Sequence, residues 1–246
     1  MTKKMLLKIS AGIIAFLLIL AVLFIAISFL GNPISANIAK DKALKYINDK
    51  YSHLNLELKD VTYSPKDGSY LISLSSSTSV DTYFFLSYRD GEIFRDNYEM
   101  SVLSGVNTMH RFCDEYKKSV TALVQAKTSD VTHINVLPEK LAKYGLDLDS
   151  AFDKTLVKNV EIIISCIGGT DAKHLSEILK TSYEVMQENG YDATKFGITG
   201  AYETALTELK NIKPTHIESE NLEEILGKAI NNTEYDGITV FSKGQK

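Results

Sequence analysis

The sequence predicts an α+β protein in which an N-terminal transmembrane helix precedes two small helix-on-antiparallel-sheet domains. Three observations carry this prediction: a long uncharged apolar run, changes between helical and strand periodicity in the remainder, and glycine- or proline-containing turns between the periodic segments. We expect a cytoplasmic tail at 1–8, a membrane anchor at 9–30, a first domain at 31–128 and a second domain at 129–246.

The apolar run gives the clearest signal in the chain. Between Ile9 and Leu30, 22 residues carry no charge. At 1.5 Å per residue this is about 33 Å of helix, enough to cross a hydrocarbon core of ~30 Å. Lipid offers no partners for backbone amides, so the segment must be helical. Three lysines and no acid precede the run, which favours a cytoplasmic N-terminus and an extracytoplasmic remainder.

A cleaved signal peptide is the alternative interpretation of this segment. The small residue Ala36 ends a stretch that could be a cleavage site, with Pro33 just upstream. The apolar core of a signal peptide is normally ~7–15 residues, which is shorter than this run. We therefore favour an uncleaved anchor, and the polar remainder is exported in both interpretations.

The exported part of the chain is acidic. Three of the 27 lysines and arginines precede residue 31, so 24 remain against 31 aspartates and glutamates. This excess of acidic residues argues against nucleic acid as a partner and against strong attraction to anionic lipid. The apolar content, rich in Val, Ile and Leu, excludes disorder as the main state.

The first domain is expected to form a helix, a strand meander and a second helix. Helical spacing begins at Ile34, and Pro33 suits a first turn because its missing amide needs no partner. A stronger amphipathic pattern predicts the second helix at 105–127. Alternating apolar residues predict strands near 54–63, 70–74, 80–88 and 93–94.

The second domain is expected to place helices on one sheet. The clearest strand-like alternation of side chains in the chain is at residues 160–167. We predict that these residues form a central strand, which ends at Gly168 and Gly169. A helix then runs from about Leu175 to a glycine stop at Gly190. Further elements are predicted as strands at 131–137, around 196–198 and at 238–241, and as a helix at 221–230.

Two pairs of residues are candidates for chemistry. Asp171 and His174 share a helical face, so a general base oriented by an acid is conceivable, although a capping aspartate beside an exposed histidine explains the same residues. His110 and Cys113 lie three residues apart on one helix, but a metal site needs more ligands than these two. We therefore expect no enzyme activity, no metal and no cofactor, with an envelope hydrolase built on either pair as the alternative.

The two cysteines of the chain, Cys113 and Cys166, allow two interpretations. Each falls on the apolar side of its own predicted element, which is typical of a buried small residue. Export would also permit a disulfide between them. The sequence leaves both interpretations open.

Short motifs in the first half resemble a known family. A lysine-tipped anchor is followed by GNP, a lysine-rich helix, STSVDT, RDGEI, DNYE and SGVNTMHR. This order is similar to that of the YfjL-like membrane-anchored proteins of Gram-positive bacteria, over about residues 1–128. The helix and meander also resemble PepSY-like and cystatin-like extracytoplasmic modules. The resemblance implies a cell-envelope protein and carries no catalytic residues.

Together these observations predict a single-pass membrane protein that holds a binding or interaction module outside the membrane. Its expected partners are the lipid bilayer, through the N-terminal helix, and a protein of the cell envelope.

Overall fold

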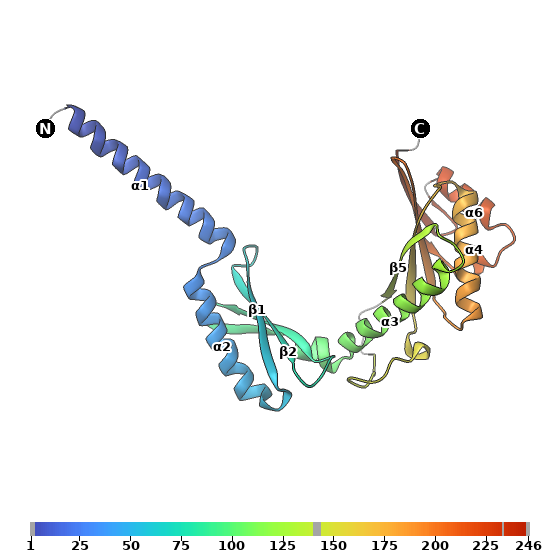
Figure 1. Cartoon of the computed structure of the whole chain (residues 1–246), viewed down its shortest axis with the longest axis horizontal. Helices are drawn as coiled ribbons and strands as arrows, with labels where there is room; N and C mark the ends of the chain where they lie inside the picture. The colour runs from blue at the N-terminus through green and yellow to red at the C-terminus, as the bar shows by residue number, and fades with distance from the viewer. Residues whose placement is uncertain (1–2, 140–143, 233, 245–246) are drawn as a thin grey trace. The chain divides into compact units, whose positions relative to one another are not determined.

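The computed structural model describes residues 3–139, 144–232 and 234–244. The chain divides into two compact units, Met1–Asn107 and Thr108–Lys246, and each is described by itself (Figure 1). Both units mix helices with a β-sheet, so the chain has the α+β class that the sequence predicts.

The first unit begins with the apolar helix α1 (Lys3–Leu30). Its described side chains are exposed except for the half-buried Ala26. Ile9 and Leu30, which bound the predicted anchor, are 46% and 78% exposed. By length and composition α1 can cross a membrane. Residues 1–2 of the predicted tail lie outside the described residues, and the rest of the tail is the first part of α1.

The rest of the first unit is a helix packed on a four-stranded sheet. Its order is β1-β2-β3-β4 with every neighbouring pair antiparallel, as the meander predicts. Ala39, Ala43 and Ile47 form the buried stripe of α2 and share one core with the inward side chains of β2 and β3. The elements are α2 (Pro33–Tyr51), η1 (Ser52–Leu54), β1 (Leu56–Ser64), β2 (Ser69–Ser76), β3 (Tyr83–Arg89), β4 (Glu92–Asp96) and the π-helical turn η2 (Glu99–Leu103).

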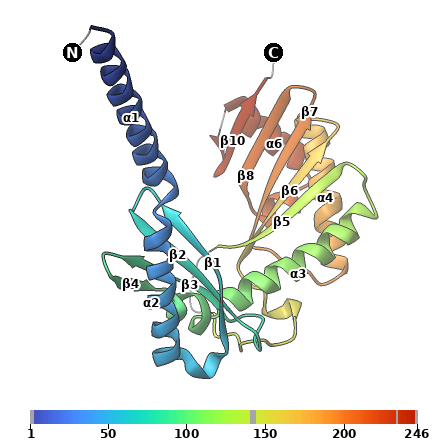
Figure 2. The ribbon, with the colours of Figure 1, turned by 60° about the vertical axis from the view of Figure 1, so that its left-hand side comes forward.

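The second unit is a six-stranded sheet with helices packed on it. Figure 2 shows α4 and α6 together behind the sheet, and α3 contributes side chains to the same core. The strand order is β5-β6-β7-β8-β10-β9, which makes β6 an interior strand, as predicted. The elements are α3 (Val106–Gln125), β5 (Val131–Pro138), η3 (Lys154–Leu156), β6 (Val160–Ile167), α4 (Ala172–Glu188), β7 (Lys195–Tyr202), β8 (Ala205–Ile212), α5 (Pro214–Ile217), α6 (Leu222–Asn232), β9 (Glu234–Tyr235) and β10 (Ile238–Lys243).

Two features of this unit differ from the sequence prediction. The prediction of a purely antiparallel sheet is wrong, because β6 and β7 are parallel. A parallel neighbour needs a long crossover, and α4 supplies it between these two strands. The strand β8, which pairs antiparallel with both β7 and β10, is additional to the predicted elements.

The division between the units also falls earlier than the expected boundary at 128/129. It lies between Asn107 and Thr108 because the apolar face of α3 belongs to the second core. Six α3 side chains are buried there: Met109, Phe112, Cys113, Tyr116, Val120 and Val124.

Candidate functional site

The junction between α1 and α2 is built from a few closely fitted residues. Gly31 ends the apolar helix at φ +78°, a conformation that side chains other than glycine rarely adopt. A Cβ at this position would lie 2.7 Å from Cγ of Tyr63, so the ring packs directly on the backbone. Asn32 caps α2, because its side-chain oxygen accepts a hydrogen bond from the amide of Ile34 at 2.9 Å.

Tyr70 of β2 ties this junction to the sheet. Its hydroxyl accepts a hydrogen bond from the amide of Asn32 at 2.8 Å and donates one to the carbonyl of Asn32 at 2.9 Å. The rings of Tyr63 and Tyr70 are also in contact, with centroids 5.1 Å apart. The end of the apolar helix is therefore attached to the folded unit through its backbone.

A second cluster in this unit surrounds the carboxylate of Asp96. One of its oxygens accepts hydrogen bonds from Nζ of Lys50 at 2.8 Å and from the hydroxyls of Tyr51 at 2.6 Å and Tyr46 at 2.9 Å. The other oxygen accepts one from the amide of Tyr98 at 3.0 Å. These bonds join the C-terminal half of α2 to the end of β4. Both carboxylate oxygens of Asp96 accept hydrogen bonds from within the cluster, and these bonds hold the helix on the sheet.

Asp171 and His174 are close together, but not in the arrangement of an acid–base pair. Asp171 caps α4, and its carboxylate accepts a hydrogen bond from the backbone amide of His174 at 3.0 Å. This bond holds the pKa of Asp171 below its ordinary value. The His174 ring instead donates from Nε2 to the carbonyl of Ile167 at 2.9 Å and packs on Gly169, where a Cβ would lie 2.7 Å from the ring. Both side chains stabilise the turn between β6 and α4.

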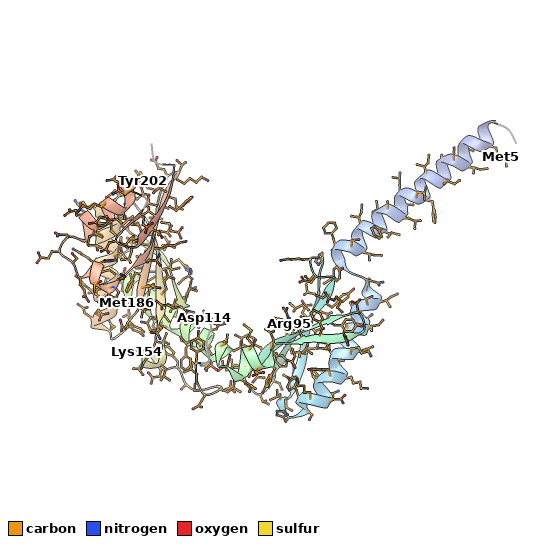
Figure 3. The ribbon with its side chains drawn as sticks, turned by 180° about the vertical axis from the view of Figure 1, so that it is seen from behind. Met5, Arg95, Asp114, Lys154, Met186 and Tyr202 are labelled. Atoms are coloured by element: carbon orange, nitrogen blue, oxygen red, sulfur yellow. The ribbon has the colours of Figure 1, made fainter. Side chains whose placement is uncertain are left out.

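His110 and Cys113 lie about one turn apart on α3 but differ in exposure. His110 is exposed, whereas Cys113 is 4% exposed and belongs to the core. The neighbouring Asp114, labelled in Figure 3, is exposed on the same helix. Burial, and secondarily Asp114, raises the pKa of the Cys113 thiol to about 11, so it stays protonated at neutral pH. A buried neutral thiol is a poor nucleophile and a poor metal ligand.

Cys166 has the same character on β6. It is 2% exposed, and both cysteines are free thiols in the structure. Burial, followed by the charge of Asp130, raises the pKa of Cys166 to about 11. Within the described residues, no three His, Cys, Asp or Glu side chains are grouped so that they could hold a metal ion.

The sequence prediction did not identify the junction or the Asp96 cluster. Both depend on residues far apart in the chain: Tyr70 lies 38 residues from Asn32, and Lys50 lies 46 residues from Asp96. One local signal was present for each feature. A glycine directly after the apolar run is typical of a helix end, and Tyr46 and Lys50 share one face of α2.

Comparison with known proteins gives two family matches along the chain. Residues 6–101 match the model of the YfjL-like N-terminal domain, and residues 115–227 match that of the YfjL-like C-terminal domain. The division between the two compact units falls in the gap between these matches. No curated protein and no solved structure gives a significant match.

Proposed function

Because the chain belongs to the YfjL-like family, as its sequence motifs predict, we propose that it is a single-pass membrane protein carrying an extracytoplasmic binding module. In this proposal α1 is the anchor, the N-terminus is cytoplasmic, and both compact units lie outside the membrane. The similarity of the first unit to PepSY-like modules remains a prediction.

The exposure of α1 is the observation that carries the proposal. Its aliphatic and aromatic side chains project on all sides from Met5 onward (Figure 3), and Phe24 and Leu30 are 74% and 78% exposed. A helix that is apolar all round needs an apolar environment on every side. Apolar surface in water costs roughly 25 cal/mol per Å². Lipid removes that cost along the uncharged run from Ile9 to Leu30.

The junction supports an anchor that is retained rather than cleaved. Cleavage after Ala36 would remove Gly31, the Asn32 cap and both hydrogen bonds to Tyr70. It would also remove the first turn of α2, which begins at Pro33. A leader that is discarded has no need of contacts with the mature fold, so these bonds favour the anchor.

The positions of the candidate catalytic residues favour binding over hydrolysis. Asp171 and His174 are each engaged with the backbone of the β6–α4 turn. The thiol of Cys113 is buried in the core. An interaction module with an envelope protein as partner is therefore the function that we propose, with no catalytic step.

Membrane extraction and protease access test the anchor and its orientation. We expect the full chain to stay with membranes during alkaline carbonate extraction, and a C-terminal tag to be digested by protease added to intact spheroplasts. Replacing Leu17, Leu20 and Phe24 by Arg should release the protein, because each Arg near the bilayer centre costs about 2.5–3.5 kcal/mol.

The control places a single Arg outside the anchor. Ile34→Arg changes a side chain that is 70% exposed on α2, so this variant should remain in the membrane fraction. Release of the unmodified chain by carbonate would contradict the anchor. Protection of the C-terminal tag would contradict the orientation.

A further inference from the structure

A cavity of about 390 Å³ lies at the junction where α1 ends. Its walls come from α1, α2, the strands β1 to β3, and the β1–β2 and β3–β4 turns of the sheet. Ile27 contributes from α1, Ser35 from α2, and Tyr63 and Tyr88 from the sheet, while Arg89 and its neighbours form the turn between β3 and β4. The cavity thus combines an apolar and aromatic wall with a charged rim.

The position of the cavity follows from the proposed anchor, on which this inference rests. Ile27 and Gly31 are four residues apart, about 6 Å along a helix. Each headgroup layer of a bilayer is about 5–8 Å thick, given ~30 Å of hydrocarbon in a total of ~40–45 Å. If α1 leaves the hydrocarbon near Leu30, the cavity opens at the level of the lipid headgroups.

The charged rim pairs one cation with one anion. Nε of Arg89 lies 3.6 Å from a carboxylate oxygen of Asp90, and the two side chains are 47% and 90% exposed. The guanidinium is further positioned by a 3.3 Å hydrogen bond to the carbonyl of Asp67 and by the ring of Phe94 at 4.8 Å. A planar guanidinium that is held in place suits a phosphate oxygen pair. A carboxylate beside it suits an ammonium group.

We propose that this cavity binds the headgroup of a zwitterionic phospholipid, with its phosphate at Arg89 and its primary ammonium at Asp90. The apolar wall at Ile27 and Tyr63 then faces the glycerol and the start of the acyl chains. A headgroup with a phosphate but no amine would place negative charge beside Asp90 without compensation. The cavity therefore favours phosphatidylethanolamine over phosphatidylglycerol.

Native mass spectrometry of the full chain in detergent tests the proposal. With equimolar phosphatidylethanolamine and phosphatidylglycerol, we expect preferential retention of phosphatidylethanolamine. Arg89→Gln should lower retention of both lipids about tenfold, because it removes a charge-assisted hydrogen bond. Asp90→Asn should abolish the preference without loss of phosphatidylglycerol. Asn tolerates the positive φ of 52° at this position.

Lys66→Gln is the matched control, because it removes an exposed cation from the neighbouring β1–β2 turn and does not line the cavity. Equal retention of the two lipids by the unmodified chain, or unchanged retention in Arg89→Gln, would overturn the proposal. Thermal unfolding by circular dichroism confirms that each variant is folded before its lipid binding is compared.

Two further measurements distinguish a headgroup site from a simple anion site and from a loss of membrane anchoring. Soluble phosphoethanolamine should displace the lipid better than inorganic phosphate, and equal displacement would indicate a simple anion site and overturn the proposal. Carbonate extraction of the same variants distinguishes failure of the membrane anchor from failure of the lipid site. Loss of the unmodified chain from membranes contradicts the proposed function, whereas stable anchoring without lipid preference contradicts the cavity proposal alone.

Discussion

Asp96 shows how a single carboxylate can hold a helix to a sheet. Burial by itself would raise the pKa of Asp96, but the hydrogen bonds from Lys50, Tyr51, Tyr98 and Tyr46 together keep it below its ordinary value. The same contacts raise the pKa of Lys50. Burial and the bond to Asp96 raise the pKa of Tyr51 to about 12. All three groups therefore keep their neutral-pH protonation states in the folded unit.

Asp96→Asn should destabilise the first unit at pH 7 by about 1–3 kcal/mol, since Lys50 and the tyrosines lose their charged acceptor. A carboxyl whose pKa is lowered on folding stabilises the fold above its unfolded pKa of about 3.9. That contribution disappears as the pH falls through the lower folded pKa. The difference between the two proteins should therefore shrink below about pH 4, as measured by thermal unfolding in micelles.

An exposed ion pair in the same unit provides the comparison for Asp96. Glu57 and Lys59 lie 2.6 Å apart, with side chains 55% and 54% exposed. Glu57→Gln should cost less than about 1 kcal/mol, as is usual for surface pairs. Equal losses for Asp96→Asn and Glu57→Gln would show that the Asp96 cluster contributes no more to stability than an exposed ion pair.

At the scale of elements, periodicity identified the strongest helices and strands but not their partners. The helix α1 was predicted because its run is uncharged and apolar on every side, whereas α3 and β6 were predicted because apolar residues recur on one face of each element. In β8 the buried positions Thr207, Leu209 and Ile212 include a polar residue and are unevenly spaced, which weakens the alternation. The parallel pairing of β6 with β7 depends on where α4 packs, and this is a tertiary property.

The candidate site was predictable only where its signal is local. Asp171 was recognised as a helix cap because it lies between a glycine pair that ends a strand and the start of a helical pattern. The contacts of Tyr70 with Asn32, and of Asp96 with Lys50, connect different elements and leave no spacing pattern in the sequence. Periodicity therefore predicts which elements form, and the structure is needed to find the side chains that join them.

The connection between α1 and α2 gives a prediction at the scale of elements. Gly31→Ala should destabilise the first unit by about 1–3 kcal/mol, because the backbone is left-handed there and the new Cβ meets the ring of Tyr63. Hydrogen exchange of α2 and β2 in the full chain measures the effect locally. Gly12→Ala is the control, since Gly12 lies within α1 with no heavy atom within 4 Å of an added Cβ. Unchanged protection in Gly31→Ala would mean that the junction is loosely attached.

For the whole molecule, the central question is which of the two units depends on α3 for its stability. The predicted boundary at 128/129 rested on a change of composition around Ser129, and that change marks the end of a helix rather than the end of a unit. The hydroxyl of Tyr116 donates to the carbonyl of Asp192 at 2.6 Å, and the side-chain amide of Gln125 donates to the carbonyl of Val131 at 3.0 Å. These bonds, together with the six buried side chains, make α3 part of the second core.

Two fragments therefore separate the alternative boundaries. A fragment spanning 104–246 should unfold cooperatively, whereas one spanning 129–246 should lack a cooperative transition. Each large apolar side chain lost from a core costs about 2–5 kcal/mol, so losing the α3 side chains together removes as much as, or more than, the 5–15 kcal/mol by which a domain is normally stable. Urea unfolding followed by circular dichroism makes the measurement, and adding a peptide of residues 104–128 to the shorter fragment should restore part of the transition. Cooperative unfolding of the shorter fragment alone would return the boundary to 128/129 and leave α3 as a linker.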